Sequence, residues 1–150
     1  MEMYRKLLQK DKIREFLNAA ARKQQLIAPT RQDGVTLFQV IQSVDSVVFD
    51  YQNTVTPPKN FFFPQSERLL RFNVRAPLLG IKLEAGIPER VLFGVRPCDV
   101  RAIELLDKVF DAEFRDDYYI DKRDKTTIVA LSCIDCSHTC FCSSFGISPG

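Results

Sequence analysis

The sequence contains no apolar run that approaches the ~20 residues of a membrane-spanning helix. Its first ten residues, MEMYRKLLQK, also lack the apolar stretch of a secretion signal. We therefore expect a cytoplasmic chain that makes no contact with a membrane. The 21 Lys and Arg residues nearly balance the 19 Asp and Glu residues, and the basic residues are scattered along the chain, which argues against nucleic-acid binding.

Motifs for nucleotide binding and for nucleophilic catalysis are missing as well. Gly94 stands alone, and Gly80 and Gly86 do not form the G-x-G-x-x-G loop that holds phosphates. The single histidine, His138, has no carboxylate partner nearby except Asp135, so no catalytic relay can be assigned. The sequence has no internal repeat and no linker rich in Gly or Ser, so residues 1–150 are expected to form a single domain.

The first part of the chain predicts two strands that form a hairpin, preceded by a helix. A short strand is expected over Tyr4 to Leu8, and then a helix that Asp11 caps and that ends near Lys23. The residues of its apolar stripe, at helical spacing, are Ile13, Phe16, Leu17 and Ala20. Extended segments at Leu26 to Pro29 and at Val35 to Ile41 flank the turn residues 32–34, which predicts the hairpin.

The middle of the chain predicts an ordered loop anchored by aromatic side chains. Prolines interrupt any regular element between Val47 and Phe72, whereas the block Phe61 to Phe63 requires burial. Ser66 is expected to cap a turn of helix through Leu69 and Leu70.

The second half predicts a βαβ unit. Val91 to Val95 and Thr127 to Leu131 have the composition of buried strands, and a polar connection over residues 111–125 precedes the second of them. Between the strands, Asp99 is expected to cap a helix whose inner residues are Ile103, Leu106, Val109 and Phe110. We therefore predict an α/β fold with a small mixed or mostly parallel sheet and flanking helices.

Five cysteines, four of them within the last eighteen residues, suggest a metal site in a cytoplasmic chain. Cys98 lies three residues beyond the end of one predicted strand, and Cys133 lies two residues beyond the end of the other. Because parallel strands end at the same edge of a sheet, both cysteines should face one crevice. The remaining three cysteines follow in an irregular loop: Cys136, Cys140 and Cys142.

Five thiols are one more than a [4Fe–4S] cluster or a structural zinc ion needs. Cys136 is the candidate for the spare thiol. Without it, Cys98, Cys133 and the pair Cys140 and Cys142 still supply four sulfur atoms from three directions. Cys98 directly precedes the expected helix cap, where free N–H groups favour a thiolate or an anionic cluster. The irregular spacing favours a cluster over zinc, and Phe141 and Phe145 are candidates to shield it from water.

The sequence leaves open the roles of two arginines and of the single histidine, and it also leaves two rival functions. Arg96 and Arg101 flank Cys98 and are candidate partners of an anionic cluster, although both positions equally suit ordinary solvated arginines. His138 is a candidate ligand, but an exposed loop residue is the commoner role. The rival functions are a structural zinc-binding interaction module and a thiol-redox protein that uses Cys133 and Cys136.

Several segments together resemble a known family. They are Asn53-Thr54-Val55, Pro57-Pro58-Lys59, Phe63-Pro64, the run from Leu92 to Ala102 and Thr139-Cys140-Phe141-Cys142. In combination they resemble the iron–sulfur beta subunit of cytoplasmic sulfhydrogenases, and the related iron–sulfur subunit of anaerobic sulfite reductase is similar, both with a 4Fe–4S dicluster domain. The resemblance extends from about Gln25 to Gly146.

The resemblance implies an electron-transfer subunit of an oxidoreductase complex with hydrogenase or sulfite reductase activity. Such a subunit would connect a flavin- and NAD(P)H-binding partner to a catalytic partner through [4Fe–4S] clusters. The motif cysteines of the family match Cys98, Cys133, Cys140 and Cys142, while Cys136 falls at a variable place. We expect one cluster here, which an isolated preparation can lose or exchange for zinc, with Asp99 and Arg96 close to it.

Members of that family are about twice as long and carry ferredoxin-type C-x2-C-x2-C-x3-C-P runs in their second half. No such run occurs in these 150 residues. We therefore expect the chain to be the N-terminal part of a longer iron–sulfur subunit that lacks its ferredoxin-like half here. The alternative is a stand-alone version whose further clusters reside on another chain.

Overall fold

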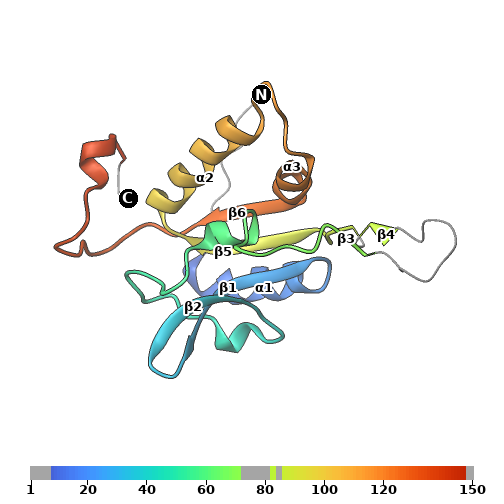
Figure 1. The fold of residues 1–150 in the computed structure, drawn as a ribbon. Coiled ribbons are helices and arrows are strands. Elements are labelled where there is room, and N and C mark those ends of the chain that lie inside the picture. Colours follow the sequence, from blue (N-terminus) through green and yellow to red (C-terminus); the bar gives the residue numbers. More distant parts are fainter. Residues whose placement is uncertain (1–7, 72–81, 84–85, 148–150) are drawn as a thin grey trace, which may run out of the picture.

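The computed structural model describes residues 8–71, 82–83 and 86–147. The α/β fold is as predicted: one sheet has the strand order β2-β1-β5-β6, with helices on both of its faces (Figure 1). The strands of this sheet are β1 (Gln25–Gln32), β2 (Val35–Val40), β5 (Arg90–Val95) and β6 (Thr126–Ala130). The helices are α1 (Ile13–Ala21), α2 (Pro97–Phe110) and α3 (Asp117–Asp124).

The predicted hairpin and the predicted βαβ unit are both confirmed. Strand β1 pairs antiparallel with β2 through the turn at Asp33 and Gly34, and it pairs in parallel with β5. Strand β5 pairs in parallel with β6 after the α2 crossover. The expected strand over residues 4–8 lies outside the described residues except for Leu8, and it stays a prediction.

Side chains alternate between the two faces of the sheet, and each face has its own buried cluster. Leu26, Ala28 and Val91 point to the face covered by Leu17 of α1. The opposite face carries Ile27 and Leu92, and α2 and α3 cover it with three buried side chains: Ile103, Tyr119 and Ile120.

Gly94 interrupts this alternation at the end of β5. The register of the β5–β6 pair shifts between Phe93 and Val95, and Gly94 has a φ of 90°, a backbone conformation that favours glycine. The extra residue turns Val95 to the same face as Leu92. This bulge therefore sets the direction in which the chain leaves the sheet toward Arg96.

The middle loop is ordered and contains two short 3-10 helices, Val44–Ser46 and Pro58–Phe61. Phe62 is fully buried and Phe61 half-buried, but Phe63 is 53% exposed, so the burial expected for the whole block holds for part of it. The helical turn expected from Ser66 to Leu70 is wrong. Leu70–Arg71 form strand β3, which pairs with β4 (Lys82–Leu83) and so satisfies its backbone groups in a ladder.

Three predictions about the helices and strands need correction. The segment expected as a polar connection contains α3, which the Asp116 side chain caps by accepting from the Tyr119 N–H at 3.0 Å. Strand β6 is half-exposed rather than buried, because it is an edge strand of the four-stranded sheet. Asp11 is not the cap of α1, which begins at Ile13 after the 3-10 helix Lys10–Lys12.

No helix among the described residues is long and apolar enough to cross a membrane.

Candidate metal centre

Two parallel strands bring the first two cysteines to the same edge of the sheet. Val95 ends β5 and pairs with Ala130, the last residue of β6. The Leu131 N–H then donates to the Val95 carbonyl at 2.9 Å, so the two chains stay together one residue further. Cys98 and Cys133 both follow from this edge, as the sequence predicts.

Helix α2 begins earlier than expected, and Asp99 is therefore not its cap. Arg96 is the N-cap residue without a capping side-chain bond, and Pro97 is the first helical residue. Proline suits this first position because it has no N–H to satisfy and its φ is already helical. Cys98 and Asp99 consequently lie inside the first turn, where backbone N–H groups are free.

The surroundings of the two thiols at the strand ends oppose their ionisation, although Cys98 is exposed and Cys133 is half-buried. Burial raises the pKa of the Cys98 thiol above its ordinary value, and the nearby Asp99 carboxylate adds to this shift. Burial also raises the pKa of Cys133, although the Arg96 guanidinium acts in the opposite direction. The expectation that the helix terminus favours a Cys98 thiolate is thus outweighed by desolvation when no metal is bound.

Three of the five cysteines line one pocket. The pocket has a volume of about 570 Å³ and lies between the first turns of α2 and the segment that follows β6. Figure 1 shows this C-terminal segment, in red, running back beside the beginning of α2. The lining residues that bear on the site are Cys98, Cys140, Cys142, Asp99, Phe141 and Phe145.

Cys133 and Cys136 stand outside the pocket lining. The Cys133 thiol is nevertheless close enough to those of Cys140 and Cys142 for their charges to influence its pKa. Among the described residues, no three His, Cys, Asp or Glu side chains are gathered tightly enough to hold a single metal ion. Three of the four predicted ligands therefore share a pocket, the fourth does not line it, and the metal site itself stays a prediction.

The C-terminal segment is folded by local hydrogen bonds. The Cys140 N–H donates to the Ser137 carbonyl at 2.9 Å, and a 3-10 helix, Cys142–Phe145, ends at Gly146 with a φ of 63°. The Phe141 and Phe145 rings stand 5.5 Å apart and line the pocket, but both side chains are largely exposed on their other side. His138 is exposed and does not line the pocket.

Tyr51 is a residue near the site that the sequence does not indicate. Its ring lies 4.2 Å from the Arg96 guanidinium, and its hydroxyl donates to the Gly94 carbonyl. Tyr51 comes from the middle loop, which carries no pattern that points to the cysteines. Arg96 itself is buried and does not line the cysteine pocket, whereas Arg101 lines that pocket and pairs with Glu104 at 2.9 Å.

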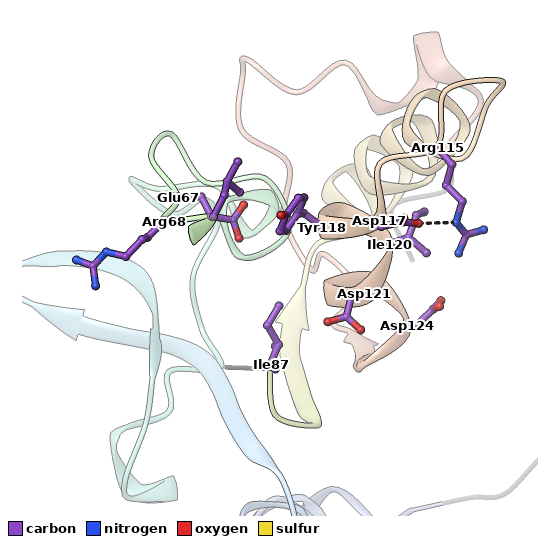
Figure 2. Close-up of a pocket in the computed structure, with 11 residues that line it drawn as sticks. Glu67, Arg68, Ile87, Arg115, Asp117, Tyr118, Ile120, Asp121 and Asp124 are labelled. Atoms are coloured by element: carbon purple, nitrogen blue, oxygen red, sulfur yellow. Dashed lines mark hydrogen bonds and ion pairs between the residues drawn. The ribbon is translucent and has the colours of Figure 1, made fainter. Parts of the chain in front are cut away.

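A second pocket of about 570 Å³ lies beside α3, and no cysteine lines it (Figure 2). Four carboxylates line it, and three of them pair with neighbouring cations: Asp117 with Arg115 at 3.3 Å, Glu67 with Lys122 at 2.5 Å and Asp121 with Lys125 at 2.8 Å, while Asp124 is the fourth. These ion pairs leave the cysteine pocket as the better candidate for a metal centre.

The fold and the pocket define an α/β protein with thiols at the carboxyl ends of its parallel strands. The chain is 32% identical over 132 residues to sulfhydrogenase 2 subunit beta of Pyrococcus furiosus. The match covers 88% of this chain and 38% of that protein. The chain is therefore related to sulfhydrogenase beta subunits, and it spans less than half the length of this relative.

No protein-family model matches the sequence. No solved structure matches it either.

Proposed function

We propose that this chain binds one [4Fe–4S] cluster and transfers electrons within an oxidoreductase complex of the hydrogenase or sulfur reductase type. The observation that carries the proposal is the convergence of Cys98, Cys140 and Cys142 on one pocket. The relationship to a sulfhydrogenase beta chain supports the type of complex. As the resemblance implies, the partners would be one subunit that binds flavin and NAD(P)H and another that is catalytic, in the cytoplasm.

The residues present fit such a cluster. Thiolates are its usual ligands, and Cys98, Cys140 and Cys142 approach the pocket from a helix and from a loop. Cys133 would be the fourth ligand, next to the pocket at the end of β6, and Cys136 would be spare. Arg96 is a buried cation whose charge acts on the Cys133 thiol, which suits the negative charge of a thiolate-bound cluster.

A bound cluster would supply reversible one-electron chemistry. The chain's own residues would hold it at the strand edge and control its contact with water. Phe141 and Phe145 would cover part of the pocket, and Asp99 lies within the pocket wall on the first turn of α2. In this proposal the domain activates no substrate itself.

The proposal is tested by iron and acid-labile sulfide analysis, with a visible spectrum, on protein purified without oxygen. We expect about four irons and four sulfides per chain, as in one [4Fe–4S] cluster, with a brown colour that dithionite bleaches. Cys98→Ser should lose the cluster. Cys136→Ser is the matched control, which removes a thiol near the same site and should keep it.

Two results would overturn the proposal. Stoichiometric zinc without iron would make the chain a structural zinc-binding module, because zinc is colourless and does not change its oxidation state. Cluster loss in Cys136→Ser with retention in Cys98→Ser would show that the ligand set is drawn from the loop alone.

A further inference from the structure

Arg96 is a buried cation without a carboxylate partner. Its side chain belongs to a residue that is 6% exposed, and its Nε atom has no hydrogen-bond partner in the described part of the chain. Within residues 8–71, 82–83 and 86–147, no Asp or Glu lies within ion-pair distance of it. A buried charge without a counter-ion lowers the stability of the fold. We therefore expect an anionic group near this guanidinium.

The contacts of Arg96 join the two strand ends that lead to the cysteines. Its Nη1 atom donates to the Ser132 carbonyl at 2.8 Å and to the Leu131 carbonyl at 3.3 Å. These are the two residues between the end of β6 and Cys133. The Tyr51 ring supports the guanidinium at 4.2 Å, and its hydroxyl is fixed by the Gly94 carbonyl at the end of β5.

Carboxylates near Arg96 do not take the place of the missing anion. Asp50 and Asp135 line a small cavity of about 90 Å³ beside Arg96, but neither forms an ion pair with it. Asp99, in the wall of the cysteine pocket, is the carboxylate whose pKa burial raises and the Lys59 and Arg96 charges lower, but no ion pair joins it to Arg96 in the described part of the chain. Because Arg96 contacts the residue before Cys133 and its charge acts on that thiol, an anionic group held by the cysteines would be a further partner of this cation.

We propose that Arg96 is a positioning residue that holds the Cys133 segment and that its charge raises the reduction potential of an anionic centre bound by the cysteines. The second part rests on the function proposed above. A positive charge in a buried site stabilises the more negative, reduced state of a cluster. Arg96 therefore makes the centre easier to reduce.

The test compares Arg96→Gln and Arg96→Lys with the parent, using the anaerobically purified protein and a spectroscopic redox titration. Arg96→Gln removes the charge, and we expect a tenfold less favourable equilibrium constant for reduction, about 59 mV for a one-electron couple. Arg96→Lys keeps the charge and should change that constant less than threefold. A purely structural role would not separate the two variants in this way.

Arg90 provides the matched control, because it is a second buried arginine, at the start of the strand β5 that leads to Arg96. It stacks over Phe62 at 5.6 Å and donates to the Phe61 carbonyl at 2.7 Å. Arg96 lies six positions further along the chain, about 20 Å of extended backbone at the usual rise per residue. Arg90→Gln should therefore leave the reduction equilibrium within twofold of the parent.

The possible outcomes decide the proposal in either direction. If Arg96→Lys binds iron and Arg96→Gln does not, the result supports a requirement for positive charge at this position. An unchanged potential in loaded Arg96→Gln overturns the effect of charge on the potential. Loss of iron from both variants while they stay folded supports the positioning role, because neither side chain reproduces the guanidinium contacts at the Leu131 and Ser132 carbonyls.

The two proposals can fail separately. If the parent binds no iron, the proposed function fails, and the positioning role is then decided by limited proteolysis of the metal-free protein. Cleavage within residues 132–142 should be at least threefold faster in Arg96→Gln, and equal rates would overturn the positioning role.

Discussion

At the scale of single residues, Gly94 is the position where a side chain is least tolerable. Its φ of 90° is unfavourable for any residue with a Cβ, and a Cβ there would stand 3.0 Å from Pro29 Cδ. We expect Gly94→Ala to lower the free energy of unfolding by about 2–4 kcal/mol, from backbone strain plus this overlap. Urea denaturation of the metal-free protein measures the change.

Gly34 is the control for this substitution. Its φ of 81° is similar, but no atom lies within 4 Å of the position of its Cβ. Gly34→Ala should therefore cost only the backbone strain, about 1–2 kcal/mol. An equal loss in the free energy of unfolding at the two positions would show that the contact with Pro29 relaxes without destabilising the fold.

Tyr119 gives the fold a dependence on alkaline pH. Burial raises the pKa of its hydroxyl, and the Asp107 carboxylate, which accepts from that hydroxyl at 2.6 Å, adds to the shift. Because the folded-state pKa lies above the unfolded value of about 10, the neutral phenol stabilises the fold below that pH. This stabilisation is lost as the pH rises above about 10.

The corresponding variant is Tyr119→Phe, measured by urea denaturation at several pH values from about 7 to 11. At neutral pH the variant should be less stable by about 1–2 kcal/mol, because the hydrogen bond to Asp107 is lost. Above about pH 10 its stability should fall less steeply than that of the parent. The remaining slope should come from Tyr51, Cys98 and Cys133, because burial also raises the pKa of each of these groups. Parallel curves for variant and parent would contradict this account.

At the scale of secondary-structure elements, α2 presents its inner face differently from the sequence prediction. Ile103 is 1% exposed and packs with Leu106 and Phe110, whereas Val109 is 64% exposed. Val109 directly precedes Phe110, so it is turned about 100° away from that residue's direction on a helix with about 3.6 residues per turn. The prediction that Val109 belongs to the inner face is therefore wrong.

Alanine substitutions on α2 test this assignment. Ile103→Ala should lower the free energy of unfolding by about 2–5 kcal/mol, because it opens a cavity in the core. Val109→Ala should change it by less than about 0.5 kcal/mol, as is usual for exposed positions. A comparable loss in both variants would mean that the outer side of α2 is also covered.

Elements with a clear periodic pattern could be predicted from the sequence, and the others could not. The hairpin, β5 and α2 follow from apolar spacing and turn residues. Helix α3, with the sequence DYYIDKRD, has almost no apolar periodicity, and it is held by packing of Tyr119 and Ile120 and by the Asp116 cap. For the site, topology predicts that Cys98 and Cys133 share an edge, but the Tyr51 and Arg96 contacts depend on a loop conformation that no local pattern encodes.

At the scale of the whole molecule, the fold and the cysteine site are separate units. The two buried clusters on the faces of the sheet consist of side chains from strands, helices and the middle loop. All five cysteines lie in the described part of the chain, and none belongs to either cluster. The sheet should therefore fold without metal, in contrast to small domains whose folding depends on zinc.

Removal of the metal should consequently affect one segment of the chain. When iron is oxidised and chelated, we expect faster amide exchange over residues 132–147, while the exchange of Ile27 and Leu92 in the central strands stays slow. The reason is that the C-terminal segment is held by local hydrogen bonds such as Cys140 N–H to Ser137, whereas β1 and β5 are paired on both sides. Hydrogen exchange followed by mass spectrometry measures both regions in one sample. Cys98→Ser should reproduce the chelated pattern and Cys136→Ser the loaded one. Loss of protection in β1 and β5 after chelation would show instead that the metal centre and the sheet fold as one unit.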